Sequence, residues 1–127
     1  CSHVVMIGRK EIVLSGWNFV SYNSKLLTGS EDFKGDFGPV NDFWGKNKVY
    51  EGNIIFKKYA GVCADTIVSP GVVIPEGTVF GAKSFTSKNH KAGEYELWYG
   101  NPLIKHCDRN KKEILEKAKL WSKEWKS

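Results

Sequence analysis

The stretch Val62-Cys-Ala-Asp-Thr-Ile-Val-Ser-Pro-Gly-Val-Val-Ile-Pro-Glu-Gly-Thr-Val-Phe-Gly-Ala-Lys-Ser-Phe85 divides into four blocks of six residues. An apolar residue opens each block: Val62, Val68, Ile74 and Phe80. A helix repeats every 3.6 residues and a strand every 2, so a period of six indicates short strands joined by tight corners. Stacked corners form a prism in which the opening residues fill one continuous core.

Three glycines, Gly71, Gly77 and Gly81, fall where corners are expected, because a corner must turn without a bulky side chain. The strands of an ordinary sandwich recur at about 8 to 12 residues, so the shorter period favours a solenoid. Counting backward in sixes adds four apolar residues to the predicted core: Phe56, Leu26, Val20 and Leu14.

The count of six is interrupted between residues 28 and 55. Leu26 and Phe56 are 30 residues apart (56 − 26 = 30), a multiple of six, so the chain should leave the prism and return in frame. The intervening segment is rich in glycine and aromatic residues, and a loop this long without regular structure is usually functional. A clamp between subunits is a second role for it, compatible with the first.

The chain changes character after Phe85. Residues 93–99 predict a last strand, and Asn101-Pro102 then redirects the chain. Asn110-Lys-Lys-Glu113 has the pattern of a capping box and predicts a helix from about Lys111 to Lys126. Four apolar residues share one helical face, which should cover the open end or the side of the prism: Ile114, Ala118, Trp121 and Trp125.

Composition limits the classes of function. The chain has 127 residues, enough for one domain, with 41% hydrophobic and 26% charged residues. Most of the net charge of +5 lies in residues 105–127, where eight Lys or Arg face four Asp or Glu, and the tail reads as a packed helix rather than a nucleic-acid surface. No apolar run approaches about 18 residues, so we expect no membrane insertion.

The three cysteines, Cys1, Cys63 and Cys107, form neither a paired framework nor a zinc pattern. This favours a reducing compartment and a cytoplasmic protein, with no metal. Because the chain starts at Cys1, almost at once within apolar sequence, we expect residues to precede it.

The run from Ile54 to Lys88, and above all residues 69–88, resembles the hexapeptide-repeat acyltransferases. Tyr99-Gly-Asn-Pro102 is similar to the closing Gly-x-Pro segment of that family, and Leu27-Thr-Gly-Ser-Glu-Asp-Phe-Lys-Gly35 resembles the loop opening of its sugar O- and N-acetyltransferases. The resemblance implies an all-β solenoid, a left-handed parallel β-helix with a protruding loop and a C-terminal α-helix. It also implies a homotrimer. The single domain would comprise N-terminal coils (1–27), the protruding loop (28–55), C-terminal coils (56–99), and a closing segment with the helix (100–127).

The resemblance also implies a reaction. It is the acetyl-coenzyme A-dependent transfer of an acetyl group to a hydroxyl or amino group of a sugar or sugar nucleotide, in the assembly of surface polysaccharide or lipopolysaccharide. The coenzyme would lie in the groove between subunits. The pantetheine arm is expected on Ala64, Gly81 and Ala82, and the nucleotide near Ser87 and Lys88. Where the family has a basic residue two positions after the closing proline, this chain has Ile104 followed by Lys105, which becomes a candidate phosphate ligand.

The catalytic base is the point at which the sequence departs from the family. The family commonly has a histidine at the start of the protruding loop, but this chain has Ser30-Glu31-Asp32. Asp32 or Glu31 could accept a proton if burial against Phe33 and Phe37 raised its pKa, or could orient an acceptor amine. A solvated acidic turn is the plain alternative.

Histidines supply one further candidate. His3, before the first expected strand, could face a subunit groove and act as base, whereas His90 and His106 are expected to be solvated. Three histidines in these places do not suit the zinc site of a carbonic-anhydrase type of β-helix. The alternative to an enzyme is a non-catalytic β-helix, a structural or interaction module that has lost its base.

Overall fold

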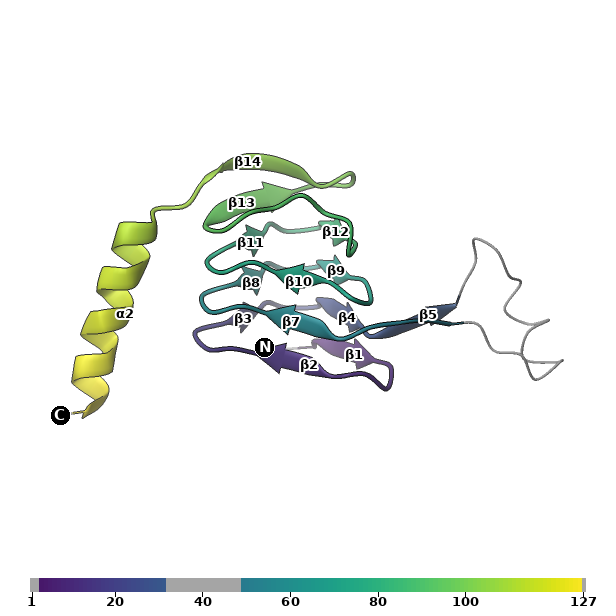
Figure 1. Ribbon diagram of the computed structural model, residues 1–127, viewed down its shortest axis with the longest axis horizontal. Helices are drawn as coiled ribbons and strands as arrows, with labels where there is room; N and C mark the ends of the chain where they lie inside the picture. The colour runs from purple at the N-terminus through teal and green to yellow at the C-terminus, as the bar shows by residue number, and fades with distance from the viewer. Residues whose placement is uncertain (1–2, 32–48, 127) are drawn as a thin grey trace, which may run out of the picture.

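The computed structural model describes residues 3–31 and 49–126, in which short parallel strands stack into a three-sided prism (Figure 1). The first sheet contains β1 (Val5–Ile7), β4 (Lys25–Leu27), β9 (Ile67–Val68) and β12 (Phe85–Thr86). The second contains β2 (Ile12–Leu14), β7 (Ile54–Phe56) and β10 (Val73–Ile74). The third contains β3 (Phe19–Val20), β8 (Gly61–Val62), β11 (Val79–Phe80), β13 (Glu96–Tyr99) and β14 (Ile104–Asp108).

The register confirms the period of six. Ile67 pairs with Phe85 in the first sheet, 18 residues further on (85 − 67 = 18), so one coil of three faces takes three blocks of six. Between β4 and β9 the offset is 42 residues, as Lys25 pairs with Ile67. The excess of 24 (42 − 18 = 24) is a further multiple of six, which is why the chain returns to the prism in frame.

The core is the predicted column of apolar side chains, and its residues contact one another along the prism axis. Val20 is 5% exposed, and six further predicted positions are completely buried: Leu26, Phe56, Val62, Val68, Ile74 and Phe80. The prediction for Leu14 is wrong, because its side chain is 54% exposed. Leu14 pairs with Phe56 on one side only, so no described coil covers its other side.

The corners of the prism do not depend on glycine. The second residue of five successive corners has a left-handed backbone, at positions six residues apart: Tyr59 (φ 65), Asp65 (φ 58), Gly71 (φ 81), Gly77 (φ 72) and Lys83 (φ 59). The prediction that Gly81 forms a corner is therefore wrong, since Lys83 turns the chain there.

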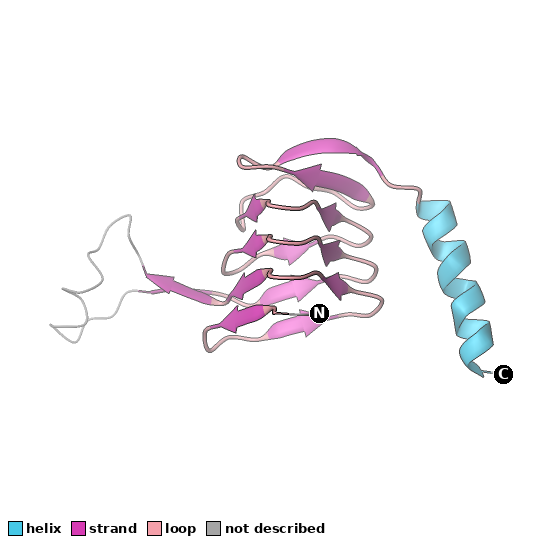
Figure 2. Cartoon of the chain, turned by 180° about the vertical axis from the view of Figure 1, so that it is seen from behind, coloured by secondary structure: helices cyan, strands magenta, loops and turns pink. Residues whose placement is uncertain are grey.

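The inserted segment leaves the prism as an antiparallel pair. β5 (Gly29–Glu31) pairs with β6 (Val49–Glu51), with Gly29 opposite Glu51. The N–H of Gly52 donates to the carbonyl of Thr28, and the Thr28 N–H and hydroxyl both donate to the Ile7 carbonyl. The base of the pair is thus attached to the first coil. The pair and the C-terminal helix extend from opposite sides of the prism (Figure 2).

A hairpin and a helix close the chain. β13 continues the third sheet as predicted, while β14, which the sequence pattern did not predict, pairs with it antiparallel. α2 (Lys111–Lys126) has the predicted bounds. Asn110 caps it, since its Oδ1 accepts from the Glu113 N–H at 3.0 Å, but the Glu113 carboxylate pairs with Lys117 instead of reaching back.

The helix covers the side of the prism incompletely. Ala118 is buried, whereas Trp121 is 54% exposed. A groove of about 280 Å³ lies along the helix, and its walls include Ile114 and Trp121 from α2 and Trp17 and Tyr59 from two corners. No helix in the described part of the chain is both long and apolar enough to cross a membrane.

Candidate functional site

One corner of the prism stacks Tyr22, Ala64 and Ala82 at equivalent positions of successive coils; we call these three residues the corner column. Backbone hydrogen bonds join the coils here. The Asp65 N–H donates to the Tyr22 carbonyl at 3.0 Å, and the Lys83 N–H donates to the Ala64 carbonyl at 2.9 Å.

The carbonyl of Ala82 ends this ladder. The next coil would offer the N–H of residue 101, but the chain leaves the prism after Gly100, and among the described residues no group donates to Ala82. Ala82 is also exposed. Because the residue is exposed and its carbonyl has no donor among the described residues, this carbonyl is a candidate acceptor for an N–H group of a ligand.

The residues that follow the corner column carry charge. The Asn23 Nδ2 donates to the Asp65 Oδ1 at 2.6 Å, which links two coils. Lys83, next to Ala82, is exposed, and its ammonium forms no ion pair with the described residues. Sequence reasoning missed Lys83, although its place in the repeat, directly after an expected coenzyme contact, could have identified it.

The space and the backbone hydrogen bonds of Gly81 are used by neighbouring residues of the same chain. A Cβ atom added there would lie 2.9 Å from the Cβ of Tyr99, so the glycine is needed for the close approach of β13. The Gly81 N–H donates to the Trp98 carbonyl at 2.7 Å, and its carbonyl accepts from Thr66 and Ser84. Both of its backbone groups are thus paired within the chain.

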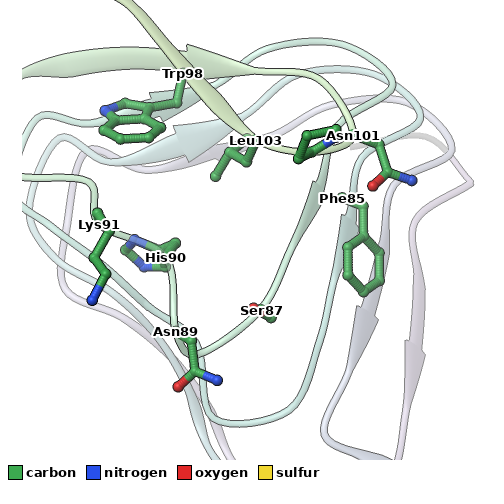
Figure 3. Close-up of a pocket in the computed structure, with 9 residues that line it drawn as sticks. Phe85, Ser87, Asn89, His90, Lys91, Trp98, Asn101 and Leu103 are labelled. Atoms are coloured by element: carbon green, nitrogen blue, oxygen red, sulfur yellow. The ribbon is translucent and has the colours of Figure 1, made fainter.

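Ser87 and Lys88 lie at the next corner of the same coil. Ser87 helps to line a hollow of about 400 Å³ at the C-terminal end of the prism (Figure 3). The hollow is lined by Phe85, Ser87, Asn89, His90, Lys91, Trp98, Asn101, Pro102 and Leu103. Lys88 is exposed, and its stem lies beside Gly71, where an added Cβ would contact the Lys88 Cβ at 3.6 Å.

His90 is half-buried and forms part of the framework of this hollow, so the expectation of a solvated side chain holds only in part. Its Nε2 donates to the Val73 carbonyl at 2.8 Å, and its Nδ1 accepts from the Ala92 N–H at 3.1 Å. The ring also packs edge-on against Phe80. Two hydrogen bonds and one aromatic contact thus fix the orientation of the ring.

Lys105 is engaged elsewhere. Its ammonium lies 2.8 Å from carboxylate oxygens of both Asp108 and Glu96, and these contacts raise its pKa. The Lys105 ammonium, the Gly93 N–H and the Trp98 indole lower the pKa of Glu96 to about 2. Lys105 therefore holds the closing hairpin together, with its charge already balanced.

The structure places two of the three candidate bases. His3 is exposed and packs edge-on against the ring of Tyr22, with 5.3 Å between ring centroids, which brings it beside the corner column. Glu31 ends β5, where its backbone pairs with Val49. Asp32, with Phe33 and Phe37, lies outside the described residues.

The expected coenzyme contacts do not converge within one chain. Ala82 and Ser87 belong to successive corners of one coil, and four residues lie between them in the sequence. Strand β12 and its exposed Phe85 lie between them. One chain thus presents two half-sites, the Ala64–Ala82 corner and the Ser87–Lys88 corner.

Comparison with known proteins identifies the fold. Neither a family model nor a curated protein sequence matches the chain. Among solved structures, a variant of AntD, an N-acyltransferase from Bacillus cereus in complex with dTDP-4-amino-4,6-dideoxyglucose and coenzyme A, is 26% identical with a TM-score of 0.77. The match covers 95% of this chain and 65% of that one, so the chain spans about two thirds of the AntD length. Another AntD structure holds dTDP and 3-hydroxybutyryl-CoA.

Two more distant structures share the fold. The hexapeptide-repeat acetyltransferase VCA0836 from Vibrio cholerae O1 biovar eltor, with acetyl-coenzyme A, is 16% identical with a TM-score of 0.69, over 85% of this chain and 55% of that one. A galactoside acetyltransferase with coenzyme A is 14% identical with a TM-score of 0.70, over 87% and 52%. The chain therefore has the left-handed β-helix fold of the hexapeptide-repeat acyltransferases.

Proposed function

We propose that this chain transfers an acyl group from coenzyme A to an amino or hydroxyl group of a sugar or sugar nucleotide. The carbonyl of the exposed residue Ala82, at the end of the corner column, carries the proposal, because the pantetheine arm has amide N–H groups that need acceptors. The AntD complex with coenzyme A and an amino sugar nucleotide supports it. AntD holds 3-hydroxybutyryl-CoA, whereas VCA0836 holds acetyl-coenzyme A. We take acetyl, the smaller of these two acyl groups, as the first donor to test.

The two half-sites favour a homotrimer. A coenzyme whose arm lies on Ala64 and Ala82 of one copy can place its nucleotide against Ser87 and Lys88 of a neighbouring copy. Lys88 would meet phosphate as a point charge. Two sheets also expose outward apolar side chains that a neighbouring copy would cover: Val5, Ile7 and Phe85 on the first and Val13 and Val73 on the second.

The reaction needs little covalent chemistry from the protein. The acceptor nitrogen or oxygen attacks the thioester carbonyl, the new C–N or C–O bond forms, the C–S bond breaks, and coenzyme A leaves as the thiolate. The acceptor's proton passes to a base, for which Asp32, Glu31 and His3 are the candidates. An amine loses its proton readily after attack, so an amino sugar makes the smallest demand on that base.

The cellular setting follows from the substrates. Coenzyme A thioesters and sugar nucleotides are cytoplasmic metabolites, and acylated amino sugars are building blocks of surface polysaccharides. We therefore place the reaction in the cytoplasm, in the assembly of surface polysaccharide or lipopolysaccharide.

A binding experiment tests the proposal first. Acetyl-coenzyme A at millimolar concentration should raise the thermal transition temperature, because the ligand binds only the native state. Ala82→Leu, which places a branched side chain on the corner, should weaken binding about tenfold or more. Glu116→Leu, on the exposed face of α2, is the matched control and should bind as the wild type does.

Transfer is then measured as release of free thiol with dTDP-4-amino-4,6-dideoxyglucose and with simple sugars as acceptors. No thermal shift at millimolar coenzyme would contradict the enzyme. Binding without transfer to any acceptor would instead support the non-catalytic β-helix.

A further inference from the structure

The side chains of the corner column differ sharply in size from one coil to the next. Its upper two positions carry only the methyl groups of Ala64 and Ala82, whereas the equivalent position one coil below Ala64 carries the phenol of Tyr22. Tyr22 is 55% exposed, so its ring stands on the surface of the corner. A linear ligand lying along the column meets small side chains for two coils and then an aromatic ring.

The position of Tyr22 matches the reacting end of a coenzyme bound in the proposed way. The nucleotide lies toward the C-terminal coil, so the arm runs from Ala82 toward the N-terminal coils. Coils stack about 4.8 Å apart, which puts Tyr22 roughly 10 Å from Ala82 along the axis. The thioester and its acyl chain are the parts of the donor that reach this level.

The backbone at Tyr22 is anchored, and its ring packs against a neighbouring ring. Its backbone carbonyl accepts from Asp65, and the next residue, Asn23, donates to the Asp65 carboxylate, so the corner is fixed to the coil above. His3 packs edge-on against the Tyr22 ring, with 5.3 Å between ring centroids. A ring supported in this way can limit the length of a neighbouring group rather than moving aside.

We propose that Tyr22 determines the length of the acyl chain, admitting acetyl and excluding longer groups. This inference rests on the proposed function, and it identifies Tyr22 as a specificity-determining residue. Discrimination between acyl chains that differ by a methylene is worth about 1 to 3 kcal/mol, or roughly 10- to 200-fold. The enzyme should therefore discriminate clearly between acetyl and butyryl, which has two more methylenes.

The experiment compares acetyl-coenzyme A with butyryl-coenzyme A. Dissociation constants are measured by calorimetry, and kcat/KM by thiol release, for the wild type, Tyr22→Ala and Tyr22→Phe. The wild type and Tyr22→Phe should prefer acetyl, because the ring is kept. Tyr22→Ala should shift the butyryl-to-acetyl ratio of kcat/KM at least about tenfold toward butyryl. Trp17→Ala, which removes an exposed aromatic ring from another corner of the same coil, should keep the wild-type ratio.

The outcomes separate this inference from the proposed function. Transfer with an unchanged ratio in Tyr22→Ala overturns the role of Tyr22 and leaves the acyltransferase intact. If transfer is absent but coenzyme binds, the same tenfold shift must appear in the ratio of dissociation constants, and its absence overturns the inference. If neither thioester binds the wild type, both proposals fail together.

Discussion

Gly77 lies directly beneath the aromatic ring of Tyr95, at equivalent corner positions of successive coils (95 − 77 = 18). A Cβ atom at residue 77 would overlap the ring. The ring is fixed by two further contacts, since its hydroxyl donates to Glu76 at 2.8 Å and the Lys111 ammonium lies 5.0 Å from its centroid. Tyr95 is itself buried, so this contact joins the last coil to the one below it.

Gly77→Ala should therefore destabilise the protein. The left-handed backbone (φ 72) and the overlap with a ring that cannot retreat should together cost about 2 to 5 kcal/mol. The measurement is urea unfolding at fixed protein concentration. Gly71→Ala is the matched control, because its backbone is also left-handed but an added Cβ has room there, and it should cost only about 1 kcal/mol. Equal costs for the two variants would contradict the role of the Tyr95 ring.

Arg109 fastens the helix to the prism. Its guanidinium donates to the Gly77 carbonyl at 2.6 Å, and its backbone N–H donates to the Tyr95 carbonyl at 2.7 Å. Arg109→Met should leave the Gly77 carbonyl without its side-chain donor and loosen the attachment of α2. The free energy of unfolding should fall by about 1 to 3 kcal/mol. Because Trp17 and Trp121 line the groove along the helix, tryptophan emission should shift to longer wavelength. Lys112→Met, on the exposed side of α2, should leave the emission unchanged. An unshifted spectrum for Arg109→Met would show that α2 stays docked without the guanidinium.

Regular spacing made most of the fold predictable. Each block of six places one apolar side chain in the core, so the positions of Val62 and Phe80 followed from the count alone. The helix was predictable because Asn110 is a strong cap ahead of a periodic apolar face. Strand β14 has no such signal, since all five of its residues are exposed and its contacts with β13 include the ion pair between Lys105 and Glu96.

The candidate site was less predictable, because it depends on where backbone groups lose their partners. The chemical type of Ala82 says nothing of its carbonyl. That group lacks a donor among the described residues because the chain leaves the prism after Gly100. Gly81 and Lys105 showed the reverse effect. Both have the residue type expected for coenzyme binding. In the fold, however, the backbone of Gly81 is already hydrogen-bonded and the charge of Lys105 is already paired with carboxylates.

Acid should weaken the closing hairpin through Glu96. Its pKa is about 2 in the folded protein against an ordinary 4.5, so its contribution is present above about pH 4.5 and is lost as the pH falls toward 2. The transition temperature of the wild type should therefore fall across this range more steeply than that of Glu96→Gln. Differential scanning fluorimetry from pH 6 to pH 2 provides the comparison. Parallel curves for the two proteins would mean that the Lys105 contact does not stabilise the native state.

Lys88 and Lys105 should differ in their effect on coenzyme binding. Lys88 is exposed at the half-site proposed for the nucleotide, whereas the charge of Lys105 is balanced by two carboxylates. Lys88→Met should raise the dissociation constant of acetyl-coenzyme A several-fold and reduce its dependence on salt, because a screened contact with phosphate is lost. Lys105→Met should lower the transition temperature through loss of the Glu96 and Asp108 contacts while the affinity at low temperature stays near that of the wild type. Calorimetric titration at two salt concentrations distinguishes these effects. A larger loss of affinity for Lys105→Met than for Lys88→Met would move the phosphate contact to the closing hairpin.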